Sequence, residues 1–162
     1  MKIAIIYHSV SGNTKKQADL VAEGAQSVDG IDVKCMSIDN PDNSWIEESA
    51  AVIFGSPCYE GSCSWQMKKF FDTPKVDFGG KLAGFFASQN WPGGGGADFA
   101  EMTMIAAALV LGMLIYSGGV SAGYPPIHFG AVSQKAPTSD IDRERAVKLG
   151  KNIASMAKKL FG

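Results

Sequence analysis

Short apolar runs alternate with segments of helical spacing along the whole of this 162-residue chain. The apolar runs, each expected to form a strand, are residues 3–7, 31–36, 50–54, 81–88 and 113–117. The expected helices are residues 14–28, 44–49, 64–72, 97–111 and 140–161, and residues 118–139 are expected to be irregular. Five strand–helix units predict an α/β fold, a parallel sheet covered by helices on both faces, because parallel crossovers are right-handed.

Composition and charge favour one folded domain spanning residues 1–162. Apolar residues make up 46% of the chain, which argues against disorder. The 15 Lys and Arg residues nearly balance the 16 Asp and Glu residues, so no overall field attracts nucleic acid or an anionic membrane. The longest apolar stretch, residues 102–116, is interrupted by Thr103 and Gly112 and is too short to predict a membrane span.

The cysteines point to a reduced compartment rather than to a disulfide framework. Only Cys35, Cys58 and Cys63 are present, and the N-terminal apolar run is too short for a signal peptide. Cys58 and Cys63 have neither a second cysteine pair nor a neighbouring histidine, so no zinc or other metal site is predicted. A cytoplasmic location is expected.

A turn rich in hydroxyl groups, residues 9–14, separates the first expected strand from the first expected helix. Its residues are Ser9, Val10, Ser11, Gly12, Asn13 and Thr14. Backbone N–H groups at a helix N-terminus point into such a turn, and the helix dipole favours an anion there. The hydroxyl groups add donors, and a glycine lets the backbone approach a ligand closely. This pattern predicts a phosphate site, although an ordinary serine-rich helix cap explains the turn equally well by itself.

The turn differs from two well-known nucleotide motifs. It lacks the lysine of the G-x-x-x-x-G-K-[ST] loop that binds nucleoside triphosphates, and it lacks the G-x-G-x-x-G pattern of dinucleotide sites. The turn therefore offers neutral donors and a helix dipole. Such a site suits a terminal phosphate that is held tightly and is not transferred.

Two further loops follow the third and fourth expected strands, and each places an aromatic residue near glycine. These loops are Gly55–Gly61, with Tyr59, and Ser88–Gly96, with Trp91. In parallel sheets, ligands bind outside the carboxyl ends of the strands, so all three loops are expected at one edge. Together they suit a ligand with a phosphate at one end and a flat ring at the other. A partly buried loop aromatic is the alternative explanation for either residue alone.

The three loops together resemble those of the flavodoxin-like proteins that bind FMN. The resemblance rests on S-x-S-G-N-T after the first strand, G-S-P-x-Y-x-G after the third, and the Gly-rich aromatic loop after the fourth. It covers essentially the whole chain and implies a three-layer α/β/α sandwich with a five-stranded parallel sheet of order 2-1-3-4-5. Residues 56–61 and 66–72 are most similar to the NAD(P)H:quinone oxidoreductase branch, the tryptophan-repressor-binding-protein type.

The resemblance implies FMN as the cofactor and distributes its parts over the three loops. Residues 9–14 would hold the phosphate, residues 57–61 would lie along the isoalloxazine ring, and residues 88–94 would reach its polar edge and the ribityl chain. No side chain is implied as catalytic. The expected cofactor-binding residues are Ser9, Val10, Ser11, Gly12, Asn13, Thr14, Ser56, Pro57, Cys58, Tyr59, Glu60, Gly61, Ser88, Gln89, Asn90, Trp91, Gly93 and Gly94.

The resemblance implies an NAD(P)H-dependent oxidoreductase that passes electrons from FMN to a quinone-like or other small acceptor. A one-electron carrier to a redox protein and an interaction module are the alternatives. Residues 109–113 contain no histidine where the quinone reductases place one at the acceptor site, and residues 71–81 lack their acceptor-side insertion. Electron-carrying flavodoxins are usually strongly acidic, whereas the charges here nearly cancel.

Two other features have open interpretations. His8, beside the phosphate turn, is expected either to contact the anion or to be solvated. The apolar, proline-rich segment Tyr124–Gly130 lies where the quinone-reductase branch closes over the flavin of a neighbouring subunit, or else forms a packed surface loop. A homo-oligomer, either a dimer or a tetramer, is therefore an open expectation.

Overall fold

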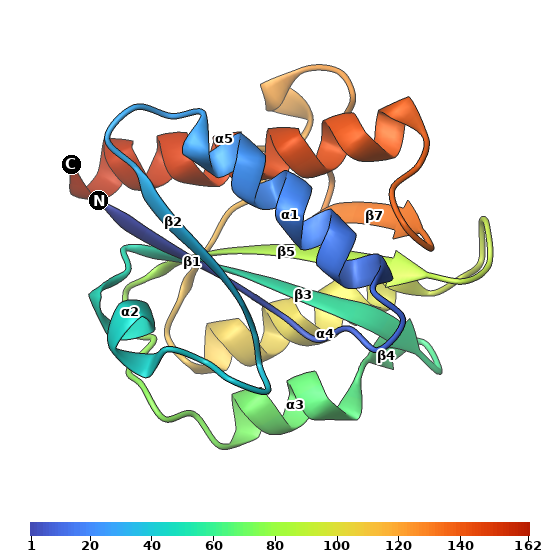
Figure 1. The fold of residues 1–162 in the computed structure, drawn as a ribbon, viewed down its shortest axis with the longest axis horizontal. Coiled ribbons are helices and arrows are strands. Elements are labelled where there is room, and N and C mark those ends of the chain that lie inside the picture. The colour runs from blue at the N-terminus through green and yellow to red at the C-terminus, as the bar shows by residue number, and fades with distance from the viewer.

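A parallel sheet lies at the centre of the molecule, with helices on both of its faces (Figure 1). The computed structural model describes residues 1–162. The strands are β1 Lys2–Tyr7, β2 Asp32–Ser37, β3 Ala51–Tyr59, β4 Ser62–Cys63, β5 Leu82–Gln89, β6 Leu114–Ile115 and β7 Ala131–Gln134. The helices are α1 Asn13–Gln26, α2 Asn43–Glu48, α3 Trp65–Asp72, α4 Ala97–Val110 and α5 Asp140–Phe161, and η1 Val120–Ala122 is a 3₁₀ turn. No helix is both long enough and apolar enough to cross a membrane.

The strand order confirms the predicted fold class. The order is β2-β1-β3-β5-β6, in which β5 and β6 are the fourth and fifth strands expected from the sequence. Alternate side chains of β1 enter two separate cores, because successive residues of a strand point to opposite faces. Ala4 and Ile6 pack on the side of α2, α3 and α4, whereas Ile3 and Ile5 pack on the side of α1 and α5. Burial on both faces explains the continuous apolar run of the central strand β3.

Helices α1 and α5 approach each other closely because glycines lie at their contact. A Cβ atom at Gly24 would be 1.8 Å from the carbonyl oxygen of Val147, and one at Gly150 would be 1.9 Å from that of Val21. No side chain fits at either position without moving backbone. This contact fixes the direction of α1, whose N-terminus follows the hydroxyl-rich turn at residues 9–14.

The expectation of an irregular segment at residues 118–139 is wrong for Ala131–Gln134, which form strand β7. Strand β7 pairs with the second half of β5, from Phe86 with Ala131 to Gln89 with Gln134, whereas β6 pairs only with Leu82 and Ala83. Two short strands therefore share the place beside β5, and the expected strand at residues 113–117 is reduced to β6. The missed strand has only four residues, with two polar side chains, and such a run gives little periodicity.

The expected loop at residues 55–61 is largely a β-hairpin. Strand β3 continues to Tyr59 and pairs with β4 in antiparallel register. Glu60 and Gly61 both have positive φ angles, 49° and 74°, which fits the two-residue turn favoured in tight hairpins. The hairpin holds Tyr59 at the carboxyl end of β3.

Candidate functional site

The three predicted loops meet at one cavity of about 330 Å³, at the carboxyl ends of β1, β3 and β5. They converge because β3 pairs in parallel with both β1 and β5. Lys135 is the one lining residue that the sequence did not predict. The residues that line this three-loop cavity are Val10, Ser11, Asn13, Thr14, Pro57, Cys58, Tyr59, Ser88, Gln89, Asn90 and Lys135.

The turn before α1 presents free backbone donors. The N–H groups from Ser11 to Thr14 donate to no acceptor within the chain, and the next one, of Lys15, donates to the Ser9 hydroxyl at 3.3 Å. Gly12 has a φ of 85° and caps the helix without a side-chain hydrogen bond. No protein atom lies within 4 Å of a Cβ built on Gly12, so the chain itself requires glycine there for its backbone conformation.

A buried pair of hydroxyl groups joins the first loop to the third. The Thr14 and Ser88 hydroxyl oxygens lie 2.8 Å apart, and the two residues are separated by 74 positions. Ser88 is the Cα partner of Pro57 on one side and of Ser133 on the other. The pair therefore ties the start of α1 to the sheet edge on which the second loop also lies.

In the second loop, one polar side chain stabilises the hairpin and another lines the cavity. The Ser56 hydroxyl is fully buried and accepts the backbone N–H of Ser64 at 2.9 Å, so this predicted residue braces the hairpin and does not line the cavity. Cys58 does line it, and burial raises the pKa of its thiol. The thiol is therefore neutral at physiological pH.

The expectation of a solvated His8 is wrong, because the side chain is only 4% exposed. Its ring meets the Tyr59 ring edge-on, with centroids 6.4 Å apart and planes at 87°. Burial lowers the pKa of His8, with a smaller opposing effect from Asp39, and its buried Nδ1 has no hydrogen-bond partner. A neutral imidazole thus packs behind the tyrosine that lines the cavity.

The third loop is fixed by Gln89 and ends in α4. The Gln89 side-chain oxygen accepts the N–H of Ala97 at 2.9 Å, which caps the helix. Gly96, the residue directly before that helix, has a φ of 80°, and a Cβ there would be 3.1 Å from the Cys58 sulfur. Trp91 is 75% exposed and lies outside the cavity lining. The other predicted residues that do not line the cavity are Ser9, Gly12, Ser56, Glu60, Gly61, Gly93 and Gly94.

Lys135 enters the site from the end of β7. Its N–H donates to the carbonyl of Gln89 at 2.7 Å, and its carbonyl accepts the Ser133 hydroxyl at 2.9 Å. Its φ is 56°, in the left-handed region that a lysine seldom adopts. Identifying residues 131–134 as a strand would have placed the next residues at the same sheet edge.

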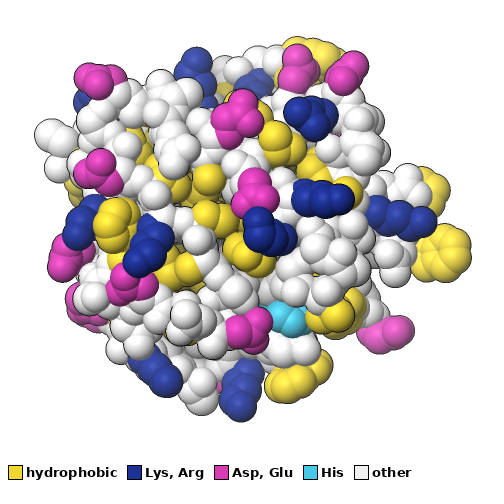
Figure 2. All heavy atoms as spheres, in the orientation of Figure 1, with side chains coloured by type: hydrophobic (Ala, Val, Ile, Leu, Met, Phe, Trp, Pro, Cys, Tyr) yellow, Lys and Arg dark blue, Asp and Glu magenta, His cyan; other side chains and the backbone are white.

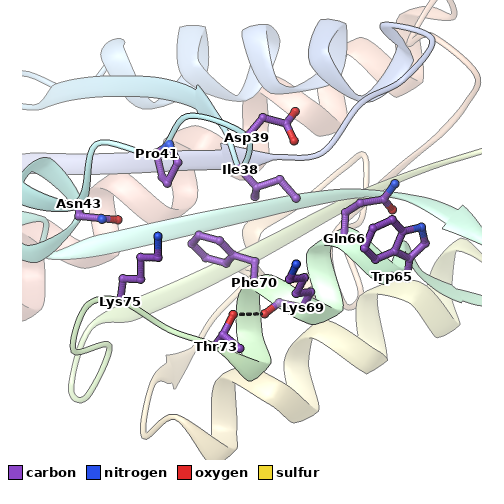
Figure 3. A pocket seen from close by; sticks show the side chains of 10 residues that line it. All are labelled: Ile38, Asp39, Pro41, Asn43, Trp65, Gln66, Lys69, Phe70, Thr73 and Lys75. Atoms are coloured by element: carbon purple, nitrogen blue, oxygen red, sulfur yellow. Dashed lines mark hydrogen bonds between the residues drawn. The ribbon is translucent and has the colours of Figure 1, made fainter.

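A second cavity, also of about 330 Å³, lies between α3 and the segment that follows β2 (Figure 3). Trp65, Phe70 and Lys69 reach it from α3, and Lys75 reaches it from the segment after that helix. Neither lysine forms an ion pair. This α3 cavity contains none of the residues predicted to bind the cofactor.

The fold and the three-loop cavity define a doubly wound α/β protein with a ligand site where the connections of β1 and β3 diverge. The profile of the flavodoxin family matches residues 5–106, and the chain belongs to this family. It is 39% identical to a flavodoxin of Clostridium saccharobutylicum over 99% of this chain and the whole of that relative.

Relatives of the quinone-reductase type are also similar, as the sequence suggested. An NAD(P)H dehydrogenase (quinone) of Archaeoglobus fulgidus is 30% identical over 98% of both chains. The structure of a flavodoxin, WrbA-like protein from Agrobacterium tumefaciens superposes with a TM-score of 0.74 at 27% identity, over 98% of both chains.

Proteins of both groups bind FMN, and the residues in the cavity fit that cofactor. The free N–H groups at the start of α1 match a phosphate, which needs several donors. Tyr59, on the second loop, lines the same cavity and supplies an aromatic surface on which a flat ring stacks well.

Proposed function

We propose that this protein holds FMN noncovalently in the three-loop cavity and carries electrons to or from a protein partner. The observation that carries this proposal is the exposed apolar rim of the site. Val10 and Trp91, on the first and third loops, are 74% and 75% exposed. Figure 2 shows hydrophobic side chains protruding at the edge where Figure 1 places the loop after β5.

Bound FMN supplies the redox chemistry, while the protein's own residues bind and orient it. The turn 9–14 binds the phosphate through backbone N–H groups, and the Thr14–Ser88 pair keeps that turn at the sheet edge. Pro57 to Tyr59 line the ring side, and the neutral His8 packs behind Tyr59. All these groups come from one chain.

The apolar rim suits a short-lived protein contact. Weak redox encounters bury small interfaces, and an exposed aromatic edge provides area without an opposite charge on the partner. The near balance of charges along the chain departs from the acidic surface usual in electron-carrying flavodoxins, so in this proposal the apolar rim supplies the contact instead of charge. Whole-length identity to a flavodoxin, higher than that to the quinone dehydrogenases, also supports the carrier over the reductase.

A second candidate function is direct reduction by NAD(P)H, and the α3 cavity favours it. Trp65 and Phe70 offer stacking surfaces, and Lys69 and Lys75 are cations without an ion-pair partner. Such a lining suits the adenosine phosphate of a pyridine nucleotide. Trp65 is the first residue of α3, two positions after the end of the hairpin that carries Tyr59.

One experiment separates the two functions. The FMN-loaded protein is mixed anaerobically with NADPH or NADH, with and without a catalytic amount of ferredoxin–NADP⁺ reductase, and cytochrome c reduction is followed. The carrier predicts rapid reduction only when the reductase is present, with a rate proportional to the concentration of this protein. Rapid reduction of the flavin by either nucleotide alone, with turnover of an added quinone, would contradict the carrier function and support the reductase function.

The rim is tested in the same assay. Trp91→Ser is expected to lower the second-order rate constant for cytochrome c reduction at equal FMN content, because it removes exposed apolar contact area. Val110→Ser is the matched control, since Val110 is 88% exposed but lies at the end of α4, away from the cavity lining. Equal losses in the two variants would argue against the rim.

A further inference from the structure

Lys135 carries the one charged side chain that lines the three-loop cavity. The nearest lysines in the turn region face elsewhere. Lys15 pairs with Asp19 at 2.9 Å, and Lys16 lines a separate groove beside α1. The only full positive charge available to a ligand in the cavity therefore comes from residue 135, far from the turn in sequence.

Contacts with α1 place Lys135 on the phosphate side of the cavity. Ala131 accepts a hydrogen bond from Gln17 of α1 at 2.7 Å, and Ala136 lines one groove together with Lys16 and Leu20. Ser133, two residues before the lysine, pairs with Ser88, whose hydroxyl touches Thr14. On both sides of Lys135 the chain thus runs beside the N-terminal half of α1.

The backbone of Lys135 is held in an unfavourable conformation. A left-handed φ costs free energy for a residue with a Cβ atom, a cost that glycine avoids, and such strain persists where surrounding bonds impose it. Here two hydrogen bonds impose it: the Lys135 N–H donates to the Gln89 carbonyl, and the Ser133 hydroxyl donates to the Lys135 carbonyl. Glycine would fit this backbone better, so the lysine side chain itself needs a reason.

We propose that Lys135 pairs with the phosphate of the bound flavin and makes the site selective for FMN over riboflavin. This rests on the proposed FMN site. The turn 9–14 offers neutral donors and a helix dipole, whereas a phosphate monoester carries nearly two negative charges at pH 7. A lysine at the cavity wall supplies the missing full charge as a point cation.

The test measures equilibrium dissociation constants for FMN and riboflavin with the apoprotein, by quenching of flavin fluorescence. Lys135→Met is expected to weaken FMN binding roughly ten- to a hundredfold and riboflavin binding less than about twofold. Lys135→Arg is expected to keep the FMN affinity of the parent. The difference in FMN affinity between Lys135→Met and the parent is expected to shrink in high salt. Lys15→Met removes an equal charge beside α1 and is expected to change neither constant by more than about twofold.

Lys135→Gly adds a readout that does not depend on the flavin. It removes the charge and the strain together, so FMN affinity falls while the apoprotein's Tm does not. Equal FMN affinity in the parent and Lys135→Met, or equal losses in Lys135→Met and Lys15→Met, would overturn the proposal while leaving the FMN site standing. Absence of FMN binding by the parent would instead overturn the proposed function.

Discussion

Glu101 is a carboxyl group buried without a partner in the first half of α4. It is 1% exposed, and neither of its oxygens has a hydrogen-bond partner. Gly130 lies against it, since a Cβ there would be 2.5 Å from a Glu101 carboxyl oxygen and 2.1 Å from the carbonyl of Phe85. Burial raises the pKa of Glu101 well above its usual value, and nearby Asp98 adds to this effect. The folded protein therefore holds a neutral acid here.

This burial predicts a fall in stability as pH rises. Between the ordinary pKa of a glutamate and the raised pKa of the folded state, the unfolded chain binds fewer protons, so rising pH favours unfolding. The slope reaches at most about 1.4 kcal/mol per pH unit for one proton. Glu101→Gln is expected to remove this slope in urea unfolding measured from pH 5 to 8, whereas the control Asp98→Asn retains most of it. Parallel profiles for Glu101→Gln and the parent would contradict a buried neutral acid.

At the scale of elements, the contact between α1 and α5 is the least tolerant of added volume. Gly150→Ala places a Cβ 1.9 Å from the Val21 carbonyl, a backbone atom that no rotamer change can move. The helices must separate, at a cost of about 1–3 kcal/mol in the free energy of unfolding. Urea unfolding measures this loss. Ser155→Ala, on the exposed side of α5, is the control and is expected to be neutral or slightly stabilising. A Gly150→Ala variant as stable as the parent would mean that the two helices can separate at little cost in free energy.

Some helices and strands could be predicted from the sequence and others could not. Doubly buried strands such as β3 and β5 are continuous apolar runs, and their parallel order follows from the helices between them, so the meeting of the three loops was predictable. Strand β7 was not, because four residues carry almost no periodicity, and Lys135 was missed with it. The division of labour among hydroxyls also depends on tertiary contacts: Ser56 braces the hairpin, and nothing in its local sequence distinguishes it from Ser11, which lines the cavity.

For the whole molecule, the site brings together three segments that are far apart in the sequence, at the carboxyl ends of β1, β3 and β5. Binding of FMN to the folded state alone stabilises it by mass action, by about 2.7 kcal/mol at a hundredfold excess over Kd, or roughly 5–10 °C in Tm. The central strands are already paired and buried without it. The local effect of the cofactor should therefore be confined to the loops.

Hydrogen–deuterium exchange with and without FMN tests this distribution. Added FMN is expected to slow exchange in residues 9–14, 56–61 and 88–96, while exchange of the paired N–H groups of β1, β3 and β5 changes only with global stability. Riboflavin, without the phosphate, is expected to protect the second and third loops but to leave the free N–H groups from Ser11 to Thr14 exchanging quickly. Protection centred on residues 38–43 and 65–75, around the α3 cavity, would move the flavin site to that cavity, because only contact or local ordering slows exchange in so restricted a region.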